Sequence, residues 1–263
     1  MKKTIVIAAV LLAGCGNNPP RPDWQMNAHN GIDRATAAYM EGNTRVETAE
    51  FKRARSALAS TGKVDLMIRA ELIQCAARVA SLVFEDCAGY NRLAQDASAA
   101  DRAYAAYLAG RLPGRLPGHL PAQLPTHLPD AGPAMTSSLE AGATVAPGAS
   151  GIADAGGTLT AADIALLPAQ HQAVAAAASD AAAAGAVQAI ADPLSKLVAS
   201  GVLLRAGKAT PQVLADAVET ASAQGWRRPL LAWLGVQAMR AAQAGDTAEA
   251  QRIKRRIDLV TEK

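Results

Sequence analysis

The chain has 263 residues, half of them hydrophobic, yet only 3% are aromatic and alanine supplies much of the apolar content. Alanine is the strongest helix former, so this composition favours closely packed helices over a β-sheet. The formal net charge is only +3, and no long basic run with interleaved aromatics appears, which argues against a nucleic-acid partner.

The first residues have the organisation of a secretion signal. Two lysines, Lys2 and Lys3, precede a nearly continuous apolar run from Thr4 to Leu12. A helix that spans a bilayer needs about 20 apolar residues, so this run is too short to be one and has the length of a signal-peptide core. We therefore expect residues 1–14 to be a signal peptide that is removed during export.

The end of this signal, Leu12-Ala13-Gly14-Cys15, resembles the lipobox of bacterial lipoproteins. The resemblance implies that the Cys15 thiol takes a diacylglyceryl group, that cleavage occurs before Cys15, and that the new amino group is acylated. Each buried CH₂ contributes about 0.8 kcal/mol, so three acyl chains would make a membrane a lasting partner. The alternative is a buried N-terminal helix with a chance cysteine.

The residue after the cysteine bears on the destination of the protein. Lipoproteins retained at the inner membrane carry aspartate there, whereas this chain has Gly16. The family's sorting rule therefore implies the outer membrane, facing the periplasm. The whole chain also looks like a group of proteobacterial envelope lipoproteins without an assigned activity, a resemblance that implies a location but no reaction.

Residues 15–27 are rich in proline and small polar residues, so we expect a tether there and an N-terminal helical region over 28–110. Its first helix has an apolar face and stops at Gly42-Asn43, and Thr44 with Glu47 has the spacing of a capping box. The faces predicted to be apolar in the first three helices are Ile32, Ala35, Tyr39 and Met40; Val46, Ala49, Phe51, Ala54 and Leu58; and Leu66, Ala70, Ile73, Ala77 and Ala80.

The third helix is predicted from Val64 to Phe84, and a fourth starts at a cap signature from Ser98 to Asp101 and ends at Gly110. If Cys15 carries lipid, Cys75 and Cys87 remain as an even pair in an oxidising compartment, which favours a disulfide between them. The alternative is two separate buried thiols.

The composition changes over residues 111–158. Five Leu-Pro pairs recur at a period of four between Arg111 and Asp130, followed by a stretch of small residues. Proline removes a backbone donor and disfavours helix in the residue before it, so an extended polyproline conformation is expected. A period of four does not match its three-residue turn, which favours a linker over a specific proline-motif ligand.

A C-terminal helical region is expected over 159–263. Thr160 with Asp163 has cap spacing, and a second helix is predicted to start at Pro168 and to run through the alanine tract 173–184. The predicted starts of the later helices are Asp192-Pro193, Thr210-Pro211, Pro229 and Asp246, and their predicted ends include Gly207, Gly225 and Gly245.

Two stretches, 37–42 and 105–110, resemble each other and place Tyr39 and Tyr107 68 positions apart. This is twice the 34-residue period of tetratricopeptide repeats, whose inter-helix turn the segment around Gly42 resembles. The Gly245-Asp246 segment looks like the same turn. The expected fold is therefore all-α, with helical hairpins of tetratricopeptide-like form or an irregular helical bundle as the alternative.

A search for chemistry finds no residue that the sequence marks as catalytic, cofactor-binding or metal-ligating. The four histidines, His29, His119, His127 and His171, have no partner at a recognised ligand spacing. The most distinctive cluster is Trp226, Arg227 and Arg228 with Trp233, which is either a ligand platform or a loop with a core anchor. The densest cations, Arg252, Lys254, Arg255 and Arg256, are expected to be solvated near a helix end.

The function expected from the sequence is that of a lipid-anchored, non-catalytic helical scaffold without a cofactor. Its partner would be another envelope protein or peptide, bound in a groove between helical hairpins. The alternative is a cell-envelope enzyme, for example one acting on cell-wall material, whose acidic residues converge only in three dimensions.

Overall fold

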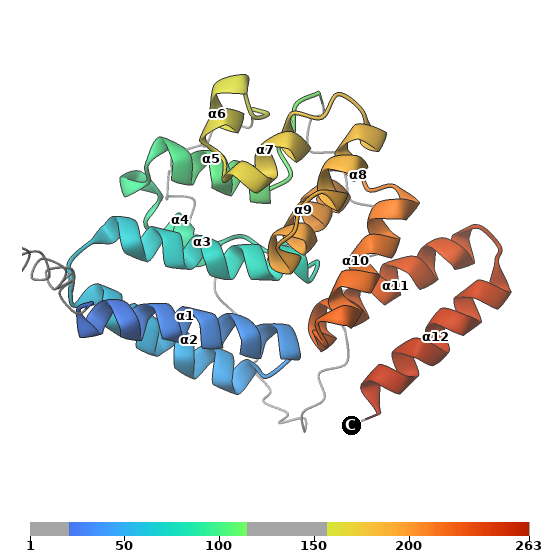
Figure 1. Cartoon of the computed structure of the whole chain (residues 1–263), viewed down its shortest axis with the longest axis horizontal. Coiled ribbons are helices and arrows are strands. Elements are labelled where there is room, and N and C mark those ends of the chain that lie inside the picture. Colours follow the sequence, from blue (N-terminus) through green and yellow to red (C-terminus); the bar gives the residue numbers. More distant parts are fainter. Residues whose placement is uncertain (1–20, 115–156, 263) are drawn as a thin grey trace, which may run out of the picture.

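The computed structural model describes residues 21–114 and 157–262. The expected signal peptide, Cys15 with its lipid, and most of the Leu-Pro run lie outside these residues. In the described part of the chain the regular elements are twelve α-helices and one 3-10 helix, without a strand (Figure 1). The all-α fold class predicted from composition is therefore confirmed.

The helices occur in the following order. They are α1 (Asp23–Glu41), α2 (Thr44–Ala59), α3 (Val64–Ala80), α4 (Ala88–Asn91), the 3-10 helix η1 (Ala94–Asp96), α5 (Ala99–Leu108), α6 (Ala161–Leu166), α7 (Ala169–Ala175), α8 (Asp180–Gln188), α9 (Pro193–Arg205), α10 (Pro211–Ala223), α11 (Arg227–Gln243) and α12 (Thr247–Thr261).

The arrangement is a set of consecutive helical hairpins that share two cores. Helices α1 and α2 form a hairpin, and α3 lies between this hairpin and the central helix α9 (Figure 1). Helix α9 also contacts α5, α7, α8 and α10, and the chain then continues through α11 and α12. Helix α11 returns to contact α1, so the two described segments of the chain form one packed body.

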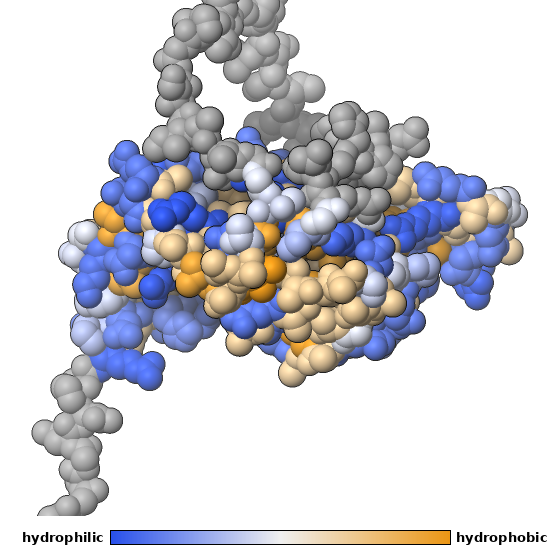
Figure 2. All heavy atoms as spheres, turned by 90° about the horizontal axis from the view of Figure 1, so that it is seen from above, coloured by the Kyte–Doolittle hydropathy of each residue, from blue (hydrophilic) through white to orange (hydrophobic). Residues whose placement is uncertain are grey.

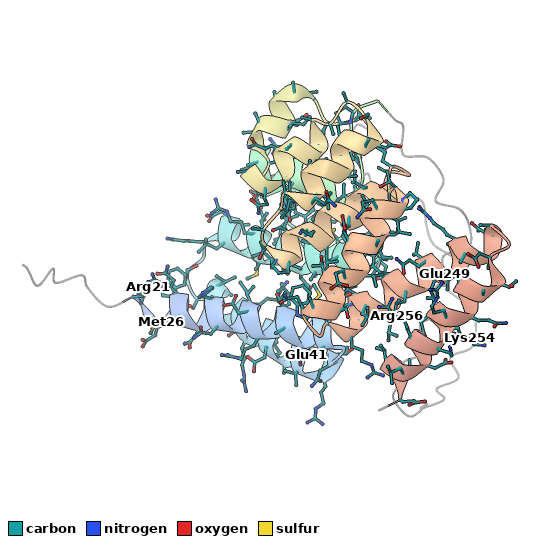
Figure 3. All side chains as sticks on the ribbon, turned by 45° about the vertical axis from the view of Figure 1, so that its right-hand side comes forward. Arg21, Met26, Glu41, Glu249, Lys254 and Arg256 are labelled. Carbon is teal, nitrogen blue, oxygen red and sulfur yellow. A yellow bond between two sulfur atoms is a disulfide. The ribbon has the colours of Figure 1, made fainter. Side chains whose placement is uncertain are left out.

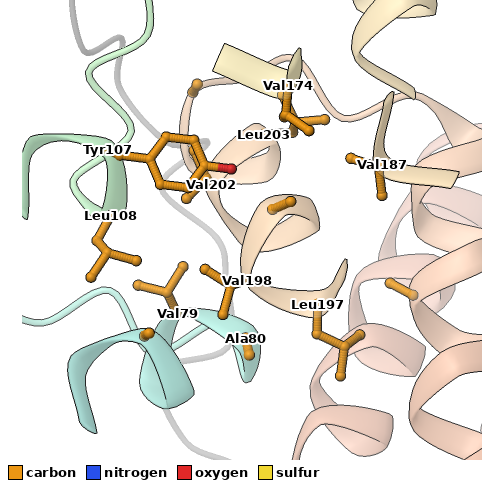
Figure 4. Close-up of a cluster of buried hydrophobic side chains, with 14 of the residues drawn as sticks. Val79, Ala80, Tyr107, Leu108, Val174, Val187, Leu197, Val198, Val202 and Leu203 are labelled. Carbon is orange, nitrogen blue, oxygen red and sulfur yellow. The ribbon is translucent and has the colours of Figure 1, made fainter. Parts of the chain in front are cut away.

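The main core lies where α3, α5 and α9 meet, with α7 and α8 covering it (Figure 4). Close approach of α9 to α3 depends on Gly201, because a Cβ atom there would lie 2.3 Å from the carbonyl oxygen of Val79. Trp233 of α11 is fully buried, and its indole N–H donates to the carbonyl oxygen of Ala80 at 3.0 Å. This bond satisfies one of the carbonyls left unpaired at the end of α3.

A second core joins α1, α2 and the start of α3 through Ala28, Ala35, Phe51, Leu58 and Ala70. Three buried glutamates accompany it, and each pairs with an arginine of another helix. These pairs are Glu50 with Arg34 of α1, Glu71 with Arg55 of α2, and Glu47 with Arg78 of α3. Removing one partner of such a pair would leave a buried charge uncompensated, so these pairs specify how the three helices pack.

The glycines predicted to end helices do so by one recurring turn. At Gly42 the backbone is left-handed, with φ of 88°, and the next N–H, that of Asn43, bonds back to the carbonyl of Ala38 at 2.7 Å. Gly245 and Asp246 repeat this turn, with φ of 75° and a bond to the carbonyl of Ala241. Glycine takes this conformation without the penalty that a Cβ atom brings.

The first helix and its successor begin at different residues from those predicted. Helix α1 begins at Asp23 instead of residue 28, because the acid favours the helix start and Ala28 already packs in the second core. Asn43, not Thr44, is the N-cap of α2, and its side chain accepts from the N–H of Val46. The glycine turn places Asn43 directly before α2, in the cap position. Thr44 is therefore the first residue of the helix and not its cap.

Two predicted helices are shorter than expected. Helix α3 ends at Ala80 instead of Phe84, because the chain turns at Leu82, whose φ is 61°. The helix predicted through the alanine tract is two helices, α7 and α8, because the Ser179 side chain caps α8 by accepting from the N–H of Ala182. The short elements α4 and η1 were not predicted.

Three residues of the predicted apolar faces and the edge of the predicted linker also differ. Val46, Ala49 and Ile73 were assigned to apolar faces but are exposed, Val46 by 39% and Ile73 by 38%. On α2 and α3, Glu47 and Gln74 face the neighbouring helix instead. Leu112, the first leucine of the Leu-Pro run, is buried in the main core. The N–H of Leu159 donates to the carbonyl of Arg111 at 2.8 Å, so the helical body includes these ends of the segment predicted as linker.

Candidate functional site

The described surface contains a cleft of about 460 Å³ that we call the α2–α3 groove. It is open on one side, and helices α1, α2, α3 and α11 all contribute to it. Its lining residues are Tyr39, Thr44, Glu47, Thr48, Phe51, Lys52, Arg55, Gln74, Arg78 and Arg228. A volume of this size is in the range of ligand-binding clefts.

Helical periodicity explains how α2 forms one wall of the groove. Thr44, Thr48 and Lys52 recur every four residues, so their side chains lie along one stripe of the helix. Gln74 and Arg78 of α3 have the same spacing and form the opposite wall. Because the residues are only one turn apart on each helix, they present polar groups along the length of the groove.

Tyr39 lines the groove beside two of its arginines. The guanidinium carbon of Arg228 lies 4.4 Å from the centre of the Tyr39 ring, and that of Arg78 lies 5.7 Å from it. Both distances are in the range of cation–π attraction. Burial raises the pKa of the Tyr39 hydroxyl, and the nearby Arg228 and Arg78 charges oppose this effect. The hydroxyl therefore stays protonated near neutral pH.

Arg228 connects the start of α11 to the α1–α2 turn. Its Nε donates to the backbone carbonyl of Tyr39 at 2.8 Å, and its Nη2 donates to the hydroxyl of Thr44 at 3.0 Å. Thr44 is the first residue of α2, directly after the Asn43 cap, so this bond ties Arg228 to the start of the helix. Arg228 thus holds its charge at one end of the groove through two neutral oxygens.

The charges that face the groove do not cancel. Arg78 contacts Glu47 at 3.4 Å, and Arg55 pairs with the buried Glu71. Among the described residues, no carboxylate lies within salt-bridge distance of the other two cations, Lys52 and Arg228. The groove consequently has an excess of positive charge at both ends of its α2 wall.

A narrow apolar slot of only about 10 Å³, too small for a side chain, lies beside the groove between α1 and α3. Ile32, Ala35, Ile73 and Ala77 line it, together with Phe51, which it shares with the groove. The unexpected exposure of Ile73 is explained by its place on the rim of this slot. The site therefore combines cations with an apolar floor, as binding clefts usually do.

The Trp-Arg cluster predicted from sequence is divided between core and groove. Trp233 is a core anchor, and Trp226 is partly buried against the main core. Only Arg228 reaches the groove, whereas Arg227 does not line it. The sequence offered no signal for the rest of the groove, because Arg228 bonds to residues about 185 positions earlier in the chain.

The predicted disulfide is present. Cys75 of α3 and Cys87 are bonded, with their Cα atoms 5.7 Å apart. Both cysteines line a hollow of about 220 Å³ next to the groove, to which Gln74 and Arg78 also contribute. The bond therefore fixes the segment after α3 against the helix that carries one groove wall.

A buried aromatic cluster surrounds His171 in the main core. The hydroxyl of Tyr107 lies 3.3 Å from the imidazole Nδ1, and the rings of Tyr104 and Tyr107 lie 5.9 and 5.0 Å from the imidazole ring. Burial lowers the pKa of His171 to about 4, although Asp192 opposes this effect. His171 is therefore neutral near pH 7 and part of the packing.

The other residues considered from sequence lie apart from the groove. His29 is exposed beside Asp33, and His119 and His127 lie outside the described residues. In residues 21–114 and 157–262, no group of three metal-binding side chains comes together. The basic residues of α12 are exposed on the outermost hairpin, where Figure 3 labels Lys254 and Arg256.

The face formed by α6, α7 and α8 is largely apolar. Seen from above, it shows a patch of weakly hydrophobic residues framed by hydrophilic ones (Figure 2). Most of the exposed residues there are alanines, and Leu166 is the large exception at 43% exposure.

Comparison with known proteins adds no relative. No protein-family model, curated protein or solved structure matches this chain. Within the described residues, none of the helices has the length and apolar character needed to cross a bilayer.

Proposed function

We propose that this chain is a bacterial lipoprotein that is anchored by lipid at Cys15 to the outer membrane. We further propose that its helical body is a non-catalytic scaffold that binds a protein or peptide of the cell envelope in the α2–α3 groove. The anchor is supported by the lipobox residues Leu12-Ala13-Gly14-Cys15 and by Gly16 after them. The proposed tetratricopeptide-like hairpins are supported by the packing of α1 on α2 and of α11 on α12 across the glycine turns at Gly42 and Gly245.

The observation that carries the binding proposal is that some residues in and beside the groove are exposed and make no contact that stabilises the fold. Lys52 lines an open cleft without a carboxylate partner among the described residues, and Ile73 of the neighbouring slot leaves an apolar side chain exposed. Surfaces that combine exposed apolar groups with polar ones commonly mark interaction sites. Catalysis by two carboxylates is less well supported, because Glu47 and Glu71 are both held by arginines.

Anchoring is tested with Cys15→Ser in the full-length protein. The variant is expected to lack the acylated mature mass and to keep its signal sequence uncleaved by the lipoprotein peptidase, because the serine cannot carry the thioether-linked lipid. A normal mature mass with unchanged detergent partitioning would refute the anchor.

Binding is tested by photo-cross-linking in living cells. A photoreactive amino acid at Thr48, in the groove, is expected to capture one defined protein, whereas the same group at Gln188 of α8 is not. Both positions are exposed, so the Gln188 variant controls for expression and for random collision. Equal cross-linking patterns from both positions would contradict groove binding.

A further inference from the structure

We propose that the occupant of the α2–α3 groove is an extended acidic peptide segment of the partner protein. Two of its carboxylates would lie at Arg228 and Lys52, with an apolar side chain between them on Phe51. This inference rests on the proposed binding function and adds the chemistry of the partner. It follows from charge, spacing and the apolar floor of the groove.

The charge argument begins with the cations that the fold leaves without carboxylates. Arg228 donates to two neutral oxygens and no salt bridge joins Lys52 to the described residues, so both retain a full positive charge at the groove. Glu47 is the one carboxylate of the lining, and it already contacts Gln74 and Arg78 at 3.4 Å each. An incoming carboxylate therefore meets net attraction, which strengthens as water leaves the cleft.

The spacing argument uses the α2 wall. Arg228 bonds to Thr44, and Lys52 is eight residues further along α2, which corresponds to about 12 Å of helical rise. An extended strand advances about 3.3 Å per residue and alternates its side chains between two faces. Residues i and i+4 of such a strand point the same way about 13 Å apart, so acids at these positions match the two cations.

The floor argument concerns the middle of the groove. Residue i+2 of the same strand would point toward α2 between its two acids, at the level of Thr48, and Phe51 on the next turn toward Lys52 offers it apolar surface. Thr48 and Gln74 lie along the walls and supply polar side chains next to the strand backbone. The pattern expected in the partner is therefore acid, any residue, apolar, any residue, acid.

The same geometry disfavours a phosphate group as the occupant. Phosphate is held best where several cations converge on one point. Here the two cations that lack a carboxylate partner in the described structure lie about two turns of helix apart, and the floor between them is apolar. An elongated ligand with separate anionic groups fits this arrangement better than a compact anion.

The test is selection from a random twelve-residue peptide library displayed on phage, with the mature chain immobilised through its C-terminus. Peptides that bind are expected to be enriched in Asp or Glu at i and i+4 around an apolar residue. Their affinity, measured by calorimetry with synthetic peptides, is expected to fall about tenfold in Lys52→Gln. It should be unchanged in the matched control Lys254→Gln, whose site lies on α12.

Arg228→Gln is a second variant, and circular dichroism shows whether it still folds, because Arg228 also holds the α1–α2 turn. Lys52 is exposed and makes no such contact, so its variants keep the test open if Arg228→Gln unfolds. Selected peptides that compete at the groove but lack acids, or that are displaced by millimolar inorganic phosphate alone, would overturn the acidic-peptide inference and leave groove binding intact. Failure to select any groove-binding peptide, together with no cross-link at Thr48, would overturn both.

Discussion

The buried His171 makes the stability of the fold depend on pH in a way that can be calculated. Its pKa is lowered from 6.5 to about 4 by burial, so the folded state disfavours the protonated ring. Between these two pH values the unfolded chain binds a proton that the folded chain does not. The free energy of unfolding must therefore fall as the pH drops from 6.5 toward 4.

The magnitude follows from the difference between the two pKa values. Each pH unit corresponds to about 1.4 kcal/mol, so the full interval contributes about 3 kcal/mol. The contribution is complete above pH 6.5 and is lost near pH 4. His171 is 1% exposed, so screening by solvent does not reduce this value much.

The assay is urea unfolding followed by circular dichroism at several pH values from 7.5 to 4, with His171→Gln as the comparison. Glutamine keeps a hydrogen-bonding group near the hydroxyl of Tyr107 but does not titrate. The variant is expected to have a lower free energy of unfolding than the wild type at pH 7.5. Between pH 7.5 and pH 4, the free energy of unfolding of the wild type should fall by about 3 kcal/mol more than that of the variant. Parallel curves for the two proteins would show that His171 is not held neutral by the core.

Three further predictions concern the framework that carries the groove. Gly201→Ala is expected to lower the free energy of unfolding by about 2 kcal/mol or more, because the new Cβ would collide with the backbone of α3. Gly185→Ala is the matched control, because a Cβ there meets nothing within 4 Å, and it should raise the free energy of unfolding by up to about 1 kcal/mol. If chemical denaturation gave the same change for both variants, the close crossing of α9 and α3 would be refuted. Replacing Cys75 and Cys87 together by alanine should lower the free energy of unfolding by about 3 kcal/mol in the chain-entropy model, and unchanged stability of the non-reduced protein would contradict this. Replacing residues 116–156 by a short flexible linker should change it by only about 1 kcal/mol, and loss of cooperative unfolding would show that this segment is structural.

The sequence was sufficient to predict those parts of the fold that depend on neighbouring residues. The capping boxes at Ser98 and Thr160 and the glycine turn at Gly42 are local, because each donor and acceptor lie within five positions of one another. The break between α7 and α8 was also readable, since Ser179-Asp180 has the form of a helix start. It was missed because alanine propensity suggested one continuous helix.

The groove could not be predicted in the same way, because its residues are set by tertiary contacts. Glu47 is buried only because Arg78, 31 positions later, meets it, and this pairing turns Val46 toward solvent. The reach of Arg228 to Thr44 spans 184 positions. Periodicity shows which residues share a face of one helix. It does not show which charged residue on that helix will pair with an arginine from a distant part of the chain.

The central claim is that the α2–α3 groove binds a partner, and filling the groove tests it most directly. Thr48→Trp places a large side chain in the cleft at an exposed position, and Gln188→Trp places the same side chain on α8. Both full-length variants would be chemically cross-linked in whole cells and purified with their partners. We expect the Thr48 variant to lose the partner that the wild type and the Gln188 variant retain; retention of that partner by the Thr48 variant would contradict the account.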